Sequence, residues 1–356
     1  MKILSLNVRG LGVTGKFSWV KNLSFCEKVD VLALQETRCK FLNERWVYNL
    51  WGNNDCGYVQ KEAVGKSGGL LLIWDSKSFI ATANLCSEFF VAVRGNWIVS
   101  GKESIIVCVY GPHKDVTKKL MWDQLNSLVN EVDTAWVLCG NFNEVRESSD
   151  RLNCTFHQHR AARFNEFISR NNLIEIPIIG RKFTRISDDG AKFSKLDRFL
   201  VSDQFINLWK DLSVIPLDRN VSDHCPLVLR DKIMDYGPKP FKVFDEWFNK
   251  EGADDIVINA WNKPISSVRS DCRFRDHLKN VKFALKDWSK NTFGNLENEI
   301  NSLKARVEAW ESRAELGNLN ECDRISWMED RKCWLEKENA KTNMLKQFNT
   351  FLTMYI

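Results

Sequence analysis

The sequence lacks the features that mark secreted, membrane-spanning and zinc-binding proteins. Its eleven cysteines stand singly, and the absence of any C-x-x-C pair argues against a zinc site of familiar spacing. The first residues, MKILSLNVRG, become polar too early for a signal sequence. No stretch reaches the roughly 18 consecutive apolar residues of a membrane span. We therefore expect an intracellular chain with reduced thiols and no membrane partner.

A strong excess of one charge is also missing. Lysine and arginine number 51 against 46 aspartates and glutamates, and the net charge of +5 leans only weakly toward polyanionic partners. The chain has 356 residues, 44% of them apolar, and no internal repeat or low-complexity tract. This length suits one large domain with a smaller one, or two domains.

Short apolar strands alternate with helical segments over residues 1–231, which predicts a layered α/β architecture. Several of the strands are nearly continuous Val, Ile and Leu runs, the pattern of strands buried on both faces. We predict strands at Lys2–Asn7, Val31–Gln35, Gly69–Trp74, Ser104–Tyr110, Trp136–Cys139, Lys195–Val201 and Pro226–Leu229. We predict helices at Phe17–Glu27, Lys118–Val132 and His159–Asn171.

The pattern changes near Asp231, where the strand signals stop. Pro238 and Pro240 follow, and from Leu278 onward apolar residues recur at helical spacing among charged ones. We predict a domain over residues 1–231, a linker over 232–277 and an amphipathic helical region over 278–356. The helical region is either a packed helical hairpin or a nucleic-acid-binding arm.

Polar residues gather at the C-terminal ends of the predicted strands, where ligand sites of layered α/β sheets lie. Glu36, in LALQETR, suits a hard cation such as Mg²⁺, for which one or two carboxylates are enough. His224, in SDHCP, can bond a phosphate or act as a base if a carboxylate such as Asp197 orients it. Alternatively, Glu36 is an ordinary glutamate at the start of a helix, and His224 has only a structural role.

Uncharged hydrogen-bonding groups stand at two further strand ends. Asn141 and Asn143, in LCGNFNEV, follow one strand, and Tyr110 and His113, in VYGPH, end another. Amides and a phenol can bond phosphate oxygens without adding charge. Each fragment alone is a weak signal.

Taken together, seven ordered motifs resemble the endonuclease/exonuclease/phosphatase superfamily, which includes DNase-I-like nucleases, abasic-site endonucleases and inositol-phosphate phosphatases. The motifs are LSLNVRGLG, LQETR, SGGLLLIW, VYGPH, GNFNEVR, SKLDRFLVS and SDHCPL, and they span residues 1–231. The resemblance implies an α/β (α+β) four-layer sandwich, in which two central β-sheets are flanked by helices. It also implies hydrolysis of phosphodiester bonds with Mg²⁺, or Mn²⁺ in its place, and no other cofactor.

Within the superfamily the sequence is most similar to endonucleases of plant non-LTR (LINE-type) retrotransposons. The similar segments include GRKFTR, SKLDRFLVSDQF and FNEFISRNNLIEIP, and later NTFGNLENEI. Such elements continue into a reverse transcriptase, whereas this chain ends at Ile356 without a Tyr-x-Asp-Asp box, as expected for a truncated element. The resemblance implies target DNA as the partner, element RNA as a second candidate, and a nuclear location.

The resemblance also implies roles for individual residues. Glu36 would hold the metal with Asn7 beside it, and Asp223 would join the metal site or its hydrogen bonds. His224, oriented by Asp197, would contact the scissile phosphate and stabilise the transition state, or act as the base. The residues implied to contact phosphate or DNA are Tyr110, Asn143, Arg38, His113, Thr184, Arg185 and Ser222.

One position departs from the family's pattern. The family has Gly-Asp-Phe-Asn, with the aspartate as the base that activates water, and this chain has Gly140-Asn141-Phe142-Asn143. An amide cannot accept that proton, and loss of a general base costs roughly 10²–10⁴-fold in rate. The expected function is therefore an impaired Mg²⁺-dependent endonuclease. An inactive nucleic-acid-binding remnant and a phosphatase of small molecules or lipids are the alternatives.

Overall fold

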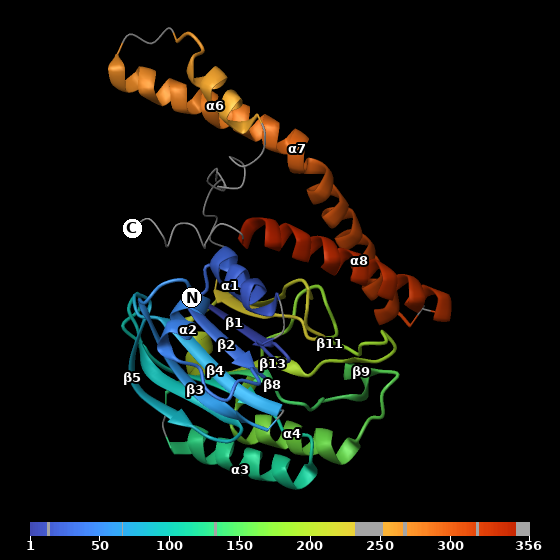
Figure 1. Ribbon diagram of the computed structural model, residues 1–356. Helices are drawn as coiled ribbons and strands as arrows, with labels where there is room; N and C mark the ends of the chain where they lie inside the picture. The colour runs from blue at the N-terminus through green and yellow to red at the C-terminus, as the bar shows by residue number, and fades with distance from the viewer. Residues whose placement is uncertain are drawn as a thin grey trace. The chain divides into compact units, whose positions relative to one another are not determined.

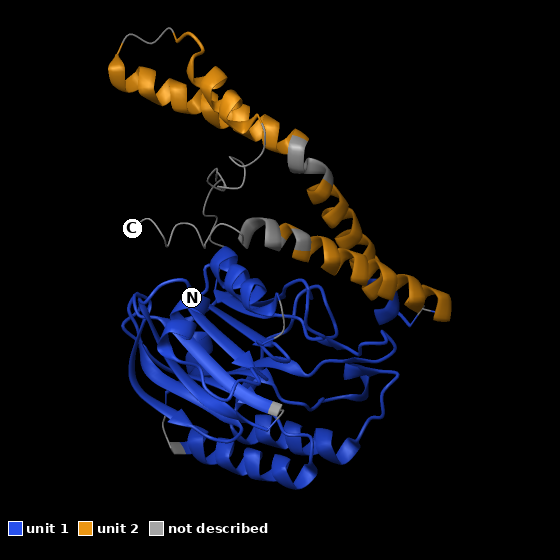
Figure 2. Ribbon diagram, viewed as in Figure 1, with its two compact units in different colours: residues 1–233, 312–320 blue, residues 234–311, 321–356 orange. Residues whose placement is uncertain are grey.

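Two six-stranded sheets stack face to face within the first 231 residues (Figure 1). The computed structural model describes residues 1–12, 15–65, 67–131, 134–231, 252–265, 269–317 and 320–346. The chain divides into two compact units (Figure 2). Unit 1 comprises Met1–Ile233 and Ser312–Asn320, and unit 2 comprises Met234–Glu311 and Glu321–Ile356.

Each sheet is built around a parallel pair of strands. The first has the order β14-β15-β1-β2-β4-β3, from Leu212–Pro216, Leu227–Asp231, Lys2–Asn7, Val31–Gln35, Ser67–Asp75 and Cys56–Val64. The second has the order β10-β13-β8-β7-β6-β5, from Leu173–Glu175, Asp197–Ser202, Ala135–Asn141, Glu103–Tyr110, Phe90–Trp97 and Phe79–Cys86. A small sheet has the order β11-β12-β9, from Arg185–Ile186, Phe193–Ser194 and Arg151–Leu152.

Helices cover the outer faces of both large sheets, which gives four layers. Alternate side chains of β1 serve two cores: Ile3 packs between the sheets, whereas Leu4 packs on the outer face under two helices. These helices are α1 (Lys16–Glu27) and α2 (Glu44–Trp51). The outer face of the other sheet packs against α3 (Asp115–Glu131) and α4 (Gln158–Arg170). The predicted four-layer sandwich is confirmed.

The shorter elements of unit 1 are a 3-10 turn, η1 (Ser148–Asp150), and a helix, α5 (Asp203–Leu208). All seven predicted strands are present, although their ends shift by up to two residues. Three longer strands, β3, β5 and β6, were not predicted. Strand β5 is mostly exposed, so its sequence lacks the continuous apolar run of a buried strand.

The described residues of unit 2 contain helices and short connecting turns, and no strand. Its helices are α6 (Ala253–Trp261), α7 (Ser270–Glu315, whose last residues belong to unit 1) and α8 (Glu321–Lys346). Helix α7 thus begins eight residues before the predicted start at 278, and α6 lies inside the predicted linker. None of the described helices is long and apolar enough to cross a bilayer.

An antiparallel hairpin is formed by α7 and α8. Three ion pairs link the two helices in opposite sequence order: Glu297–Lys341 at 3.1 Å, Glu299–Lys337 at 2.6 Å and Arg306–Asp330 at 2.6 Å. Buried apolar side chains lie on both helices, among them Ile300, Val307 and Trp334. The structure therefore shows a packed helical hairpin, and binding of nucleic acid by these helices stays a prediction.

Candidate active site

The two parallel strand pairs end at the same edge of the sandwich. In register, Asn7 at the end of β1 faces Gln35 at the end of β2, and Tyr110 at the end of β7 faces Asn141 at the end of β8. The carboxyl ends of four strands therefore present polar side chains together, as ligand sites of such sheets do.

Two predicted site groups reach this edge from the opposite direction. Asp197 is the first residue of β13, which runs antiparallel to β8 and pairs with Asn141. His224 precedes β15, which runs antiparallel to β1. Both residues were predicted at strand C-terminal ends, and this is corrected: antiparallel strands bring their amino ends to the same edge.

Glu36 follows β2 with a φ of 51° and is held by three side chains. Its Oε1 accepts hydrogen bonds from Tyr110 Oη at 2.6 Å and Asn7 Nδ2 at 3.2 Å, and its Oε2 accepts one from Arg38 at 3.0 Å. Burial opposes ionisation, but these bonds outweigh it and lower the pKa of Glu36. Burial and the adjacent Glu36 raise the pKa of Tyr110 well above its ordinary value. The site thus presents an ionised carboxylate beside a protonated phenol.

A buried histidine–aspartate pair stands beside Glu36. His224 Nδ1 lies 2.7 Å from Asp197 Oδ2, and the same oxygen accepts a 2.6 Å bond from Thr184 Oγ1. The Thr184 hydroxyl in turn accepts the backbone N–H groups of Leu196 and Asp197. Asp197 therefore fixes the orientation of the ring and leaves Nε2 for the cavity that His224 lines.

The Asn141–Asn143 segment forms a tight turn against β7. Asn141 is 1% exposed and is the last residue of β8, so it lies inside the strand and does not follow it as predicted. Its Oδ1 accepts the N–H of Asn143 at 2.8 Å, and Asn143 Nδ2 donates to Gly111 O at 2.6 Å. Gly140 has a φ of 137°, and a Cβ there would lie 2.0 Å from Val109 O, so only glycine fits.

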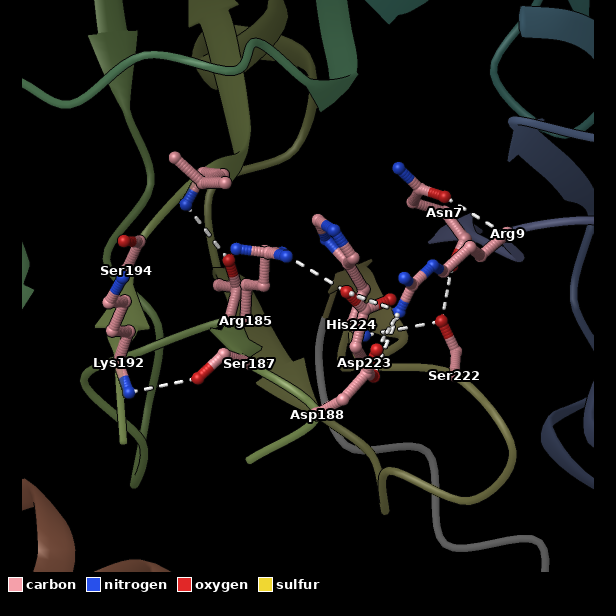
Figure 3. Close-up of polar contacts among 12 residues, drawn as sticks. Asn7, Arg9, Arg185, Ser187, Asp188, Lys192, Ser194, Ser222, Asp223 and His224 are labelled. Atoms are coloured by element: carbon pink, nitrogen blue, oxygen red, sulfur yellow. Dashed lines mark hydrogen bonds and ion pairs between the residues drawn. The ribbon is translucent and has the colours of Figure 1, made fainter. Parts of the chain in front are cut away.

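Two arginines meet at the carboxylate of Asp223 (Figure 3). Its Oδ2 lies 3.1 Å from Arg185 Nε and 3.3 Å from Arg9 Nη1, whereas its buried Oδ1 has no hydrogen-bond partner among the described residues. Burial raises the pKa of Asp223, but the charges of His224, Arg185 and Arg9 outweigh it and lower it overall. Arg9 also holds Asp188 on the β11–β12 hairpin at 2.9 Å.

These groups surround one cavity of about 570 Å³. Its ionisable lining is strongly basic, with seven lysines and arginines against two carboxylates, Glu36 and Asp223. The basic residues are Arg9, Arg38, Lys118, Arg151, Arg160, Arg185 and Lys192. A phosphate-bearing ligand matches such a lining.

Eight of the thirteen predicted site residues line the cavity, and five lie behind it. The lining residues are Glu36, Arg38, His113, Asn141, Asn143, Arg185, Asp223 and His224. Those outside the lining are Asn7, Tyr110, Asp197, Thr184 and Ser222. The predicted DNA contacts of Thr184 and Ser222 are corrected, because both are 1% exposed and bond Asp197 and Asn7 O respectively.

Three basic residues that lie close to the groups above were not predicted as site residues. Arg9 lies two residues beyond the end of β1, a position that could have been noticed. Lys118, in the first turn of α3, is buried and donates to Asn143 O at 2.6 Å and to Glu144. Lys16 is also buried and donates to Val8 O at 2.6 Å and Arg9 O at 3.0 Å.

The residues present fit a hard cation. Among the described residues there is no cluster of three or more His, Cys, Asp and Glu side chains that could hold a metal ion. Magnesium needs fewer, since it keeps several waters and takes one or two carboxylates. The cavity offers two carboxylates, Glu36 and Asp223, and the Oδ1 atom of Asp223 is buried without a partner. Glu36, with Asn7 beside it, and Asp223 would hold the ion.

Solved structures share this fold. The AP endonuclease LMAP from Leishmania major is 17% identical with a TM-score of 0.53, and the match covers 64% of this chain and 86% of that one. The 3′ phosphatase NExo from Neisseria, bound to a product DNA hairpin, is 19% identical with a TM-score of 0.51 and coverage of 65% and 100%. The endonuclease domain of TRAS1, a telomere-specific non-LTR retrotransposon, is 13% identical with a TM-score of 0.48 and coverage of 64% and 96%.

The curated proteins give no sequence match to this chain. The model of one protein family, however, matches residues 4–224, a range that contains all thirteen predicted site residues. This chain therefore belongs to the endonuclease/exonuclease/phosphatase family.

Proposed function

We propose that this protein is a Mg²⁺-dependent phosphodiesterase that nicks DNA and derives from a plant LINE-type retrotransposon. The observation that carries the proposal is the cavity itself, which joins the oriented His224 and the ionised Glu36 to seven basic side chains. Two structures of the same fold are named for action on DNA or are bound to it, which supports DNA as the substrate. The retroelement origin rests on the sequence segments that resemble that branch, and implies a nuclear location.

The charge of the cavity suits a phosphodiester that develops negative charge in the transition state. His224, held through Nδ1 by Asp197, directs Nε2 toward a non-bridging oxygen and stabilises the charge there. Asn143 adds an uncharged hydrogen-bond donor, and the Tyr110 phenol, which donates to Glu36, holds that carboxylate in place. When bound, Mg²⁺ supplies Lewis-acid stabilisation of the phosphoryl oxygens. Positioning and electrostatics together account for most of the expected rate.

Activation of the attacking water is the weak step. Asn141 Oδ1 already accepts the N–H of Asn143, so the remaining polar atom of its side chain is an amide donor. A carboxylate at this position would keep that bond and offer a second oxygen as a base. We therefore propose that this protein cuts more slowly than a relative with aspartate here.

Nicking of supercoiled plasmid tests the proposal. Full-length protein should convert supercoiled to open-circular DNA in Mg²⁺, should not do so in EDTA, and should lose the activity in the His224→Ala variant. The matched control is His159→Ala, because His159 is exposed on α4 and does not line the cavity. Equal nicking by wild type and His224→Ala would show a contaminating nuclease or a wrong site.

A second candidate function is DNA binding without cleavage, and Asn141 is the observation that favours it. Binding depends on phosphate contacts from basic residues, which this substitution leaves in place. Wild-type protein that binds duplex DNA tightly but shows no Mg²⁺-dependent nicking, even as the Asn141→Asp variant, would establish this function. Release of inorganic phosphate from small phosphomonoesters, without nicking, would instead indicate a phosphatase.

A further inference from the structure

A row of cross-strand neighbours leads away from His224 along the cavity. His224 pairs with Arg185 through an isolated bridge, Arg185 pairs with Ser194 across β11 and β12, and Ser194 pairs with Arg151 across β12 and β9. Side chains of directly paired residues lie on the same face of a sheet. All four line the cavity, so this row forms one continuous wall.

The two ends of this row differ in charge. Both carboxylates of the lining, Glu36 and Asp223, belong with His224. Asp223 is its neighbour in sequence, and Glu36 bonds Asn7, whose carbonyl accepts the hydroxyl of Ser222, two residues before His224. At the other end are three basic residues from three elements: Arg151 of β9, Arg160 of α4 and Lys192 of the β11–β12 hairpin.

The basic end keeps most of its charge for a ligand. Arg160 is paired with Asp115 at 2.7 Å, and Arg151 Nη1 donates to Thr155 O at 2.9 Å. Lys192 is exposed, and its hydrogen bonds among the described residues use backbone atoms: its N–H donates to Ser187 Oγ at 2.9 Å, and its carbonyl accepts the Ser187 N–H at 2.9 Å. Figure 3 shows Lys192 and Ser194 on the side of Arg185 away from His224.

The length of the row separates the two ends. Neighbouring strands lie about 4.8 Å apart, so three steps across the strands place the backbone of Arg151 roughly 14 Å from that of His224. A single phosphate group is much smaller than this separation. The group that binds at His224 therefore leaves the basic end open for a different anionic group.

We propose that Arg151, Lys192 and Arg160 form a second phosphate subsite, which binds another phosphodiester, further along the DNA strand whose scissile phosphate lies at His224. The subsite rests on the proposed function, since it assumes a polynucleotide substrate. It sets the direction in which that strand crosses the molecule, from β15 across the β11–β12 hairpin to β9. A substrate with only one phosphodiester gains nothing from it.

The salt dependence of DNA binding tests this subsite without relying on cleavage. Binding of a fluorescent duplex to full-length protein in EDTA is measured by anisotropy over a series of NaCl concentrations. Each lost phosphate contact should reduce the slope of log K against log [salt] by about 0.9 and weaken binding about three- to tenfold near 0.1 M salt. We expect this reduction in slope and affinity for Lys192→Gln and a larger one for Arg151→Gln/Lys192→Gln. Lys192→Arg keeps the positive charge and should bind DNA like the wild-type protein.

Lys210→Gln is the matched control, because Lys210 is exposed, outside the cavity, and carries the same charge. An unchanged slope in Lys192→Gln, or an equal loss in Lys210→Gln, would overturn the subsite while leaving the proposed function intact. Failure of the wild-type protein to bind duplex DNA at all would overturn both. Unfolding midpoints of the variants, measured in parallel, separate lost contacts from lost folding.

Discussion

The Asn141→Asp variant should nick DNA about 10²–10⁴-fold faster than the wild-type protein, because it restores a general base. At about 1.36 kcal/mol per tenfold, this range corresponds to about 2.7–5.4 kcal/mol of the activation barrier. The gain should appear in kcat with little change in KM, since the new interaction forms only in the transition state.

The structure indicates why a single atom, the second polar atom of the side chain at position 141, should decide the nicking rate. Aspartate is nearly isosteric with asparagine and keeps the 2.8 Å bond to the N–H of Asn143, so the backbone of β8 and the turn need not move. The change replaces the amide nitrogen by an oxygen that can accept a proton. A carboxylate that is only 1% exposed would be costly elsewhere, but here seven basic residues line the same cavity and offset the cost.

Single-turnover nicking of supercoiled plasmid across pH is the assay. Asn153→Asp is the matched control, because Asn153 also lines the cavity but is exposed and distant in sequence from the family motif. It adds the same charge without adding a base at the reacting centre. Acceleration in Asn141→Asp and none in Asn153→Asp would attribute the gain to the position.

Two results would refute the reasoning. Wild-type protein as fast as Asn141→Asp would show that the carboxylate is dispensable. A gain below about tenfold, together with loss of activity in His224→Ala, would identify His224 as the base, with Asp197 as its partner at 2.7 Å.

Three further predictions concern groups that support the cavity. Lys118→Met should lower the free energy of unfolding in denaturant by about 3–5 kcal/mol, because it leaves Glu144 buried without its cation, and Lys118→Met/Glu144→Gln should recover part of the loss. Asp197→Asn should reduce single-turnover nicking at least ~10²-fold with unchanged DNA affinity, because His224 loses its orienting carboxylate; an equal loss of DNA affinity would contradict this. The folded-state pKa of Glu36 lies below its ordinary value of 4.5, so its ionised form stabilises the protein above that value, and this stability is lost as the pH falls through the folded pKa. Mg²⁺ binding by calorimetry should therefore stay constant from about pH 7 to about pH 5, and a decline already in this range would contradict the assignment.

The core strands could be predicted because burial leaves a simple signature. Strands β1 and β2 are apolar runs covered on both faces, and their predicted bounds are those of the structure. The direction in which a strand runs relative to its neighbours has no comparable pattern in the sequence. Asp197 and His224 were predicted beside the other site residues, but as strand C-terminal ends, because a sequence does not show that β13 and β15 run antiparallel to their neighbours.

The sequence also does not show which side chains of the site face the cavity and which are buried. Thr184 and Ser222 stand in family motifs beside true cavity residues, yet their hydroxyls face inward and bond Asp197 and Asn7. The basic end of the cavity gave no signal at all. It depends on strands of only two residues, β9, β11 and β12, whose pairing is set by tertiary contacts and not by a periodic pattern.

Under the proposed function, binding and chemistry therefore depend on separate residues of this cavity. The seven basic side chains come from seven different elements or loops around the rim, and none of them bonds Asn141. The oriented histidine depends on Asp197 and Thr184, and Glu36 depends on Asn7, Tyr110 and Arg38. The exchange of aspartate for asparagine at position 141 leaves all of these contacts in place, because the one hydrogen bond of the Asn141 side chain among the described residues is the one from Asn143 N–H. A copy that loses its base in this way should keep its affinity for DNA, so a comparison of binding with nicking, rather than nicking alone, reveals what the substitution has changed.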